Sequence, residues 1–268
     1  MPETHVRSAL AGDYPAFVHL FPQLGAPDET PSAARWEIEM VPGTLIAEIE
    51  GAIAGYAFAQ TLTNTGYVRN LVVAAEARRR GVGKSLMGAM AERFHAAGCE
   101  HWCLNVRPEN AAAIALYEGF GLRGVRMQEA FLLPWDAAAG LAAPGRAVHV
   151  SAIAPAEDAA IELRFGLPPG QVTADRARGR VLLVAKESAE ILGFSSFDIR
   201  FGGSFPFRIA DAAAIAPLVA GCRAYADRRE TIRLVAEDDP VVADALRTAG
   251  GVPVMRTLHM TGRLPGIG

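Results

Sequence analysis

Residues 71–85, LVVAAEARRRGVGKS, carry the strongest structural signal in this chain. An apolar segment of strand type passes through a basic turn containing Gly81 and Gly83 into an amphipathic helix. Glycine has no Cβ, so such a turn can present consecutive backbone N–H groups to an anion. The helix that follows adds unpaired N–H groups and the positive end of its dipole. The segment therefore predicts a strand, an anion-binding turn and a helix.

Two motifs compete for this turn. A nucleoside-triphosphate P-loop would use Gly83-Lys84-Ser85, but it needs a further glycine at position 78, where this chain has an arginine. The other motif is a diphosphate-binding turn of the form Gln/Arg-x-x-Gly-x-Gly/Ala. Arg78, Gly81 and Gly83 meet every specified position of it. A basic glycine turn is also compatible with a plain helix start, so the turn alone leaves all three interpretations open.

A second motif lies downstream, after a strand-like segment at residues 102–106. Pro108 ends that strand, and Asn110 is a good N-cap for the helix that follows. The helix runs through Leu116 and Tyr117 into a glycine-rich stop at residues 119–122. No apolar strand ending in aspartate follows the basic helix, which disfavours a P-loop ATPase.

These two motifs, in this order, resemble those of the GNAT superfamily of acyl-CoA N-acyltransferases. The matching residues are Arg78, Gly81 and Gly83 in the turn, and Asn110, Ala113, Leu116, Tyr117, Gly121 and Leu122 in the second motif. The resemblance implies an α+β fold with a mixed, mostly antiparallel sheet. Helices flank that sheet, and it splays open between its fourth and fifth strands.

The rest of the chain supports a duplication of this fold. Strands and helices expected in the first half recur in the same order in the second half, from residues 148–150 to a last strand at residues 254–260. We therefore expect a GNAT domain at residues 1–135, a linker rich in Ala, Gly and Pro at residues 136–147, and a second GNAT-like domain at residues 148–268. An unrelated α+β extension is the alternative for the second half.

The second copy lacks the residues of the first copy's motifs. Its turn has Ala210-Asp211-Ala212 in place of arginines and glycines, and a carboxylate there would repel a diphosphate. Leu246 or Arg247, depending on the alignment, stands where the first copy has Tyr117. We expect this copy to be degenerate and not to bind acyl-CoA. Pro206 argues against a central strand at residues 205–209.

The resemblance implies acetyl-CoA as cosubstrate and no metal. The pantetheine arm would bind the backbone of Leu71, Val72 and Val73, with the N–H group of Val73 as oxyanion donor, and Asn110 would hold the arm from the facing side. Tyr117 would protonate the leaving sulfur, although it could instead simply fill the space between helix and sheet. The predicted pyrophosphate ligands are Arg78, Arg79, Gly81, Val82, Gly83 and Lys84.

The general base is not evident, because Tyr67, Arg69 and Asn70 occupy the fourth strand where many relatives carry a glutamate. Glu48, Glu50 and His101 are weak substitutes. The leading function is an N-acetyltransferase acting on a primary amine of a small molecule or peptide. Two alternatives stay open: a non-catalytic acyl-CoA sensor or regulatory protein, and a nucleoside-triphosphate binder.

Composition narrows the partners. The 268 residues include 26 Lys and Arg against 29 Asp and Glu, a formal net charge of −3, which gives no general attraction to nucleic acid or to an anionic membrane. No apolar segment is long enough to span a bilayer. The three cysteines lack metal-binding spacing and are expected as reduced thiols in the cytoplasm. The oligomeric state is open, a homodimer included.

Overall fold

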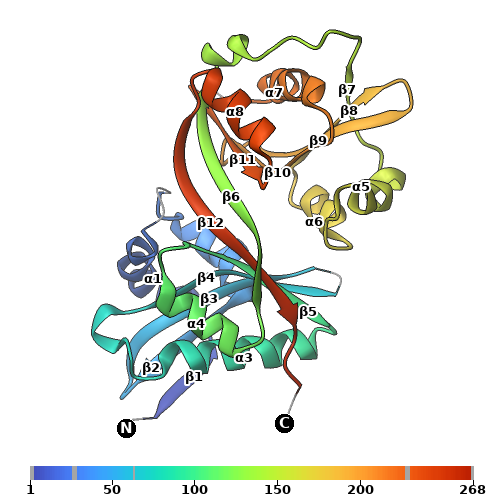
Figure 1. The fold of residues 1–268 in the computed structure, drawn as a ribbon. Helices are drawn as coiled ribbons and strands as arrows, with labels where there is room; N and C mark the ends of the chain where they lie inside the picture. The colour runs from blue at the N-terminus through green and yellow to red at the C-terminus, as the bar shows by residue number, and fades with distance from the viewer. Residues whose placement is uncertain (1–2, 26–28, 63, 227–229, 267–268) are drawn as a thin grey trace. The chain divides into compact units, whose positions relative to one another are not determined.

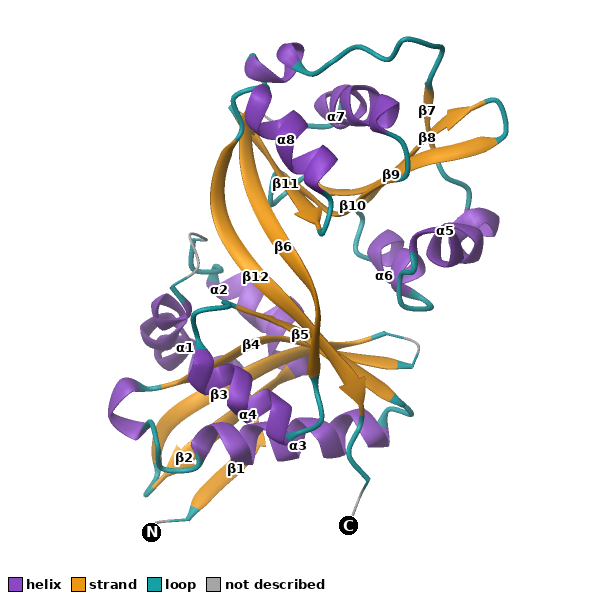
Figure 2. Ribbon diagram, in the orientation of Figure 1, coloured by secondary structure: helices purple, strands orange, loops and turns teal. Residues whose placement is uncertain are grey.

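The computed structural model describes residues 3–25, 29–62, 64–226 and 230–266. The chain forms two compact units, one of residues 1–125 with 258–268 and one of residues 126–257. Figure 2 shows that each contains a sheet flanked by helices. The expected α+β class is confirmed. Within the described residues, no helix is both long and apolar enough to cross a membrane.

The elements of the first copy follow the expected order (Figure 1). They are β1 (Thr4–Ser8), η1 (Ala11–Asp13), α1 (Tyr14–Leu20), η2 (Phe21–Leu24), α2 (Ala33–Arg35), η3 (Trp36–Met40), η4 (Val41–Gly43), β2 (Thr44–Ile49), β3 (Ala52–Thr61), β4 (Thr65–Val73), η5 (Ala75–Ala77), α3 (Val82–Ala96), β5 (His101–Val106), α4 (Ala111–Gly119), β6 (Arg123–Pro134) and η6 (Ala137–Gly140). The sequence pattern predicts two short strands near Val125 and at residues 130–133, but β6 is one continuous strand, so that prediction is wrong.

The second copy repeats this order. Its elements are β7 (His149–Ala152), η7 (Pro155–Glu157), α5 (Asp158–Phe165), α6 (Gln171–Ala177), β8 (Val181–Glu187), β9 (Glu190–Asp198), β10 (Gly203–Ile209), η8 (Ala212–Ala214), α7 (Ile215–Arg223), β11 (Thr231–Glu237), α8 (Pro240–Thr248) and β12 (Val252–Arg263). β10 lies between β9 and β11, so Pro206 does stand in an inner strand. The strand tolerates it because the β10–β9 register shifts between Ser204 and Phe207.

The last strand of each copy completes the sheet of the other unit. The strand order of the first unit is β1-β2-β3-β4-β5-β12, and β12 pairs antiparallel with β5 from Leu258 opposite Val106 to Arg263 opposite His101. The strand order of the second unit is β6-β11-β10-β9-β8-β7, with β6 paired antiparallel to β11. The expected boundaries at residues 135 and 148 presume that each copy keeps its own last strand, so they differ from the compact units at both β6 and β12.

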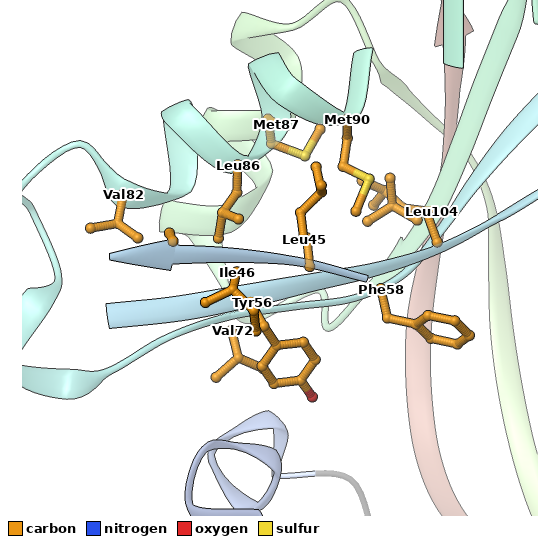
Figure 3. Packing of buried hydrophobic residues seen from close by; sticks show 14 of the residues in the cluster. Leu45, Ile46, Tyr56, Phe58, Val72, Val82, Leu86, Met87, Met90 and Leu104 are labelled. Carbon is orange, nitrogen blue, oxygen red and sulfur yellow. The ribbon is translucent and has the colours of Figure 1, made fainter. Parts of the chain in front are cut away.

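Two layers of side chains cover the sheet of the first unit. Figure 3 shows Val82, Leu86, Met87 and Met90 of α3 packing on one face, with Tyr56 and Val72 pointing to the opposite face. α1 covers that second face, where the ring of Phe17 lies 5.3 Å from the ring of Tyr56. These two layers hold the sheet between α3 and α1.

Candidate active site

The turn before α3 has the backbone conformation of an anion-binding nest. Arg79 and Gly81 both have positive φ angles, 65° and 89°, and residues in the left-handed region let neighbouring N–H groups point to one side. A Cβ placed on Gly81 would meet nothing within 4 Å, so glycine is needed here for its φ angle rather than for space.

The first turn of α3 supplies further N–H donors. The apolar spacing of Leu86, Met87, Met90 and Phe94 predicts a helix from Ser85, but the helix begins three residues earlier, at Val82. The first intrahelical bond runs from Ser85 N–H to Gly81 O at 3.0 Å, and helix geometry leaves the N–H groups of Val82, Gly83 and Lys84 without intrahelical acceptors. Among the residues that the structure describes, Arg79, Arg80 and Lys84 form no ion pair, so the turn and the first turn of α3 carry three exposed cations next to these amides in the sequence.

Gly83 joins the turn to the other parts of the site. A Cβ on Gly83 would lie 3.1 Å from Leu116 Cδ2 on α4, 3.8 Å from Val73 Cγ2 and 3.9 Å from Leu71 Cδ2 on β4. The absence of a side chain at Gly83 therefore brings the start of α3, the end of β4 and the helix that carries Tyr117 into direct contact.

β4 has a free edge next to this turn. Its parallel pairing with β5 joins Thr65–Val68 to His101–Leu104 and does not reach Leu71 or Val73 in the described part of the chain. On its other side β4 continues to pair with β3 up to Val73 opposite Gly55. The expected splay between the fourth and fifth strands is thus present in the first unit.

Strand alternation shows which backbone groups face the free edge. Ala74 N–H donates to Ala54 O of β3 at 2.9 Å, so Val72, two residues earlier, also directs its N–H and C=O toward β3. Leu71 and Val73 then direct theirs to the free edge. Val72 was predicted with them as a ligand of the pantetheine arm, but its backbone groups belong to the β3 ladder.

A β-bulge marks the point where the splay begins. The β3–β4 register shifts between Phe58 and Ala59, which pair with Asn70 and Val68, so Arg69 is the extra residue. Bulges bend a strand and re-aim side chains, and they are common beside active sites. The guanidinium of Arg69 lies 4.5 Å from the centre of the Tyr67 ring.

Arg78 is placed differently from the other predicted phosphate ligands. Its Nε donates to Val73 O on the free edge at 3.3 Å, and its Nη2 donates to Gln23 Oε1 at 3.2 Å. The Arg78 side chain therefore covers the edge of β4, whereas Lys84 stands in the first turn of α3 together with the unpaired amides.

The second motif forms α4 as expected. Asn110 caps this helix, since its Oδ1 accepts from Ala113 N–H at 3.1 Å, which leaves the Asn110 amide NH₂ group to donate elsewhere. Tyr117 is only 7% exposed and belongs to the first unit's core. Burial raises the pKa of Tyr117 to about 12, so its hydroxyl stays protonated across the physiological range.

The three residues considered as bases are paired, exposed in a turn, or distant from the splay. Glu48 accepts from Arg7 Nε at 2.8 Å and is held in an ion pair with that guanidinium. Glu50 lies exposed in the turn between β2 and β3. His101 is the first residue of β5. It lies about 13 Å along an extended strand from Asn105, the first residue of β5 beyond its pairing with β4.

A histidine that no sequence motif marks lies at the splay. His259 of β12 stands opposite Asn105 of β5, and its Nδ1 lies 2.8 Å from Asn105 Oδ1. Asn105 Nδ2 in turn donates to the Tyr67 hydroxyl at 2.9 Å. The only signal in the sequence was the alternation of polar and apolar residues around both positions, which many strands share.

The corresponding turn of the second unit is built differently. Asp211 caps η8, since its Oδ1 accepts from Ala213 N–H at 2.9 Å, and it forms an ion pair with Arg146. The backbone hydrogen bond from Ala213 and the Arg146 guanidinium lower the pKa of Asp211. A fixed carboxylate at this helix start opposes binding of a second anion.

Comparison with known proteins agrees with this geometry. The acetyltransferase (GNAT) family matches residues 11–122. An N-alpha-acetyltransferase of Sulfurisphaera tokodaii is 30% identical over 115 residues, which are 37% of this chain and 67% of that protein. This chain belongs to the GNAT family.

Other GNAT relatives match over shorter stretches. The [ribosomal protein bS18]-alanine N-acetyltransferase of Escherichia coli (strain K12) is 34% identical over 71 residues, 26% of this chain. The chain spans about half the length of that relative, 48%.

Two solved structures share the fold over nearly the whole chain. A GCN5-related N-acetyltransferase from Sphaerobacter thermophilus has a TM-score of 0.67 at 20% identity, covering 98% of this chain and 97% of that one. A tandem GNAT protein from the clavulanic acid biosynthesis pathway has a TM-score of 0.61 at 17% identity, covering 99% of this chain and 100% of that one. The fold of both copies therefore has experimental counterparts.

Proposed function

We propose that the first unit is an N-acetyltransferase that moves the acetyl group of acetyl-CoA to a primary amine of a small molecule or peptide. One observation carries the proposal: the bare amides at the start of α3 lie at the end of the free edge of β4, with Gly83 against both β4 and α4. A diphosphate fits the first of these features, and an extended amide-containing arm fits the second.

Each residue then has one task. The N–H groups of Arg79 and of residues 81–84 bind the diphosphate, and Lys84 adds charge. The edge groups of Leu71 and Val73 bind the pantetheine arm as an added strand would, after the Arg78 side chain releases Val73 O. The N–H group of Leu71, the edge residue closer to the bulge, stabilises the oxyanion that forms at the thioester carbon, in place of the N–H group of Val73, which lies at the diphosphate end of β4. Tyr117 donates its proton to the sulfur as the C–S bond breaks.

The acceptor is proposed from the named relatives. One relative is named for the alanine of a ribosomal protein and another as an N-alpha-acetyltransferase, so peptides with a free N-terminal amine are the first acceptors to test. Small primary amines complete the panel, because a fold alone does not select the acceptor.

Calorimetric titration of the full chain with acetyl-CoA tests the binding site. We expect Lys84→Glu to weaken binding at least tenfold, because it reverses a charge beside the diphosphate. The matched control is Arg164→Glu, which reverses an exposed helical arginine of the second unit and should change the Kd less than twofold. Equal binding by wild type and Lys84→Glu would contradict the proposed cradle.

Release of free CoA thiol across the amine panel tests the transfer itself. Wild-type protein should release thiol only with an acceptor present. Tight binding of acetyl-CoA with no turnover on any acceptor would instead favour a non-catalytic acyl-CoA sensor.

A further inference from the structure

Three strands of the first unit contribute a chain of hydrogen-bonded polar side chains. His259 Nδ1 lies 2.8 Å from Asn105 Oδ1, and Asn105 Nδ2 lies 2.9 Å from the Tyr67 hydroxyl. The alternate positions of β4 and β5 face α3, since a Cβ on Gly66 would clash with the Phe94 ring and Trp102 packs edge-on against that ring. Because side chains alternate along a strand, the polar chain lies on the opposite face of the sheet, the one that α1 covers.

The chain lies where the reacting end of the substrate is expected. The diphosphate cradle follows the last residue of β4, so an arm bound along Val73 and Leu71 extends back toward the bulge at Arg69. Pairing of β4 with β5 ends at Val68 opposite Leu104, and Asn105 is the next residue of β5. The thioester end of the arm would therefore stop beside Asn105 and the histidine opposite it.

We propose that His259, delivered by the last strand of the chain, is the general base that deprotonates the acceptor amine. This inference rests on the proposed acetyltransferase function. It supplies the group that β4 lacks, from a residue 154 positions after Asn105 in the sequence.

Asn105 sets the tautomer of the imidazole. Its Nδ2 is used toward Tyr67, so its Oδ1 faces His259 and can only accept. The proton of a neutral His259 then sits on Nδ1, and the lone pair sits on Nε2. Asn105 is thus a positioning residue, in the way that an asparagine orients the histidine of some cysteine proteases.

The proton balance of the reaction is complete with these groups. Nε2 of His259 takes one proton from the ammonium form of the acceptor, and the freed nitrogen lone pair forms the C–N bond at the thioester carbon. The C–S bond then breaks, and the sulfur leaves with that electron pair and takes the Tyr117 proton. The attacking nitrogen also gives up a second proton to solvent, and solvent returns a proton to Tyr117. The nitrogen keeps its third proton in the amide, and the proton held by His259 is released to solvent.

Few other groups on this face could give the same pH dependence. Tyr67 and Arg69 face it from β4, His101 and Cys103 lie on alternate positions of β5, and Thr257 and Thr261 flank it on β12. The covering helix α1 adds Tyr14 and the exposed His19. Among these side-chain types only histidine normally changes charge between pH 5 and 7. A fall of kcat/KM at acidic pH that disappears in His259→Asn and persists in His101→Asn can therefore be assigned to His259.

The test is the pH dependence of kcat/KM for His259→Asn, with the most active amine of the panel as acceptor. The asparagine amide can still donate to Asn105 but cannot take a proton. We expect kcat to fall by about 10²–10³-fold and the acidic limb to disappear, with the Kd for acetyl-CoA within twofold of wild type. His101→Asn is the matched control, since it makes the same substitution at the start of β5 and should leave both the rate and the limb unchanged.

A second variant keeps the test decisive if His259→Asn misfolds. Asn105→Asp places a carboxylate on Nδ1 and should move the acidic limb to higher pH by about one unit or more, which a purely structural role would not do. An active wild type whose rate and acidic limb survive both changes overturns the role of His259 alone. A wild type that binds acetyl-CoA but turns over no amine overturns the acetyltransferase, and the base with it.

Discussion

Replacing Gly83 by valine should separate the contact that assembles the site from the backbone conformation of the turn. The built Cβ of residue 83 lies 3.1 Å from Leu116 Cδ2, already a tight contact, and valine adds two methyl groups beyond it. Either Leu116 leaves its rotamer or α4 moves away from β4. Overpacking of this kind costs about 1–3 kcal/mol.

That strain should appear in acetyl-CoA binding. The bound state needs the start of α3, the edge of β4 and α4 in their close arrangement, so a loosened Gly83→Val protein must restore it on binding. An energy of about 1–3 kcal/mol corresponds to about a 5- to 150-fold rise in Kd. Titration calorimetry on the full chain measures this directly.

The matched control lies one helical turn and a half further along α3. Gly88 also sits in α3 and is partly buried, but a Cβ there would meet nothing within 4 Å. Gly88→Val should therefore leave the Kd within twofold, because valine and glycine differ little in helix propensity compared with the expected strain.

Shortening the opposing side chain should relieve the effect. Leu116→Ala removes the atoms that the new methyl groups would meet, so the double variant Gly83→Val/Leu116→Ala should bind at least fivefold more tightly than the product of the two single effects predicts. Strictly multiplicative effects, or a Gly83→Val protein that binds like Gly88→Val, would refute the idea that Gly83 joins these elements.

Three further outcomes follow from the described contacts. Tyr117→Phe should lower kcat about 10²-fold and leave acetyl-CoA binding unchanged. Because burial raises the pKa of Tyr117 to about 12, wild-type activity should not be lost through deprotonation of Tyr117 below about pH 11, which a pH–rate series measures. Asp13→Asn should lower the free energy of unfolding by about 2 kcal/mol at pH 7, because the Arg7 guanidinium stabilises the Asp13 carboxylate and lowers its pKa. That stabilisation is complete above about pH 4 and is lost as the pH falls through the pKa of the folded state. The unfolding free energies of wild type and variant should therefore converge in acid titrations. Met260→Ala should cost about 2–5 kcal/mol in the thermal transition that acetyl-CoA raises, because the fully buried Met260 belongs to the core of the first unit; a loss confined to a transition that the ligand does not affect would contradict this assignment.

Local chemistry made the first motif predictable. Gly81 and Gly83 indicated a turn that needs bare backbone, and the structure shows a positive φ at the first and a close contact with Leu116 at the second. Asn110 indicated a helix start, and it caps α4 as expected. Each of these signals depends on residues a few positions apart, which is the range at which sequence patterns are informative.

Pairing between distant strands was not predictable in the same way. β6 and β12 have the same length and similar alternation, so each would satisfy the sheet edge of either unit. A strand pattern reports which face is buried and does not report which partner it faces. The position of His259 beside Asn105 depends on that pairing, which is why the sequence offered Glu48, Glu50 and His101 as bases instead.

The two copies diverge at matched positions of a shared framework. Asn110 and Asp239 each cap their helix by accepting from the N–H group three residues on, at 3.1 Å and 3.0 Å. Counting seven residues from each cap pairs Tyr117 with Leu246, which settles the alignment that the sequence left open. The buried Leu246 has no proton to donate. Asp211 caps η8, the element that corresponds to the turn before α3. The second copy thus shares the fold of the first without the groups proposed for its chemistry, and its last strand completes the sheet of the first unit. Loss of that strand would remove a sheet edge and His259 together, so selection on the first unit can maintain the second copy even without a ligand of its own.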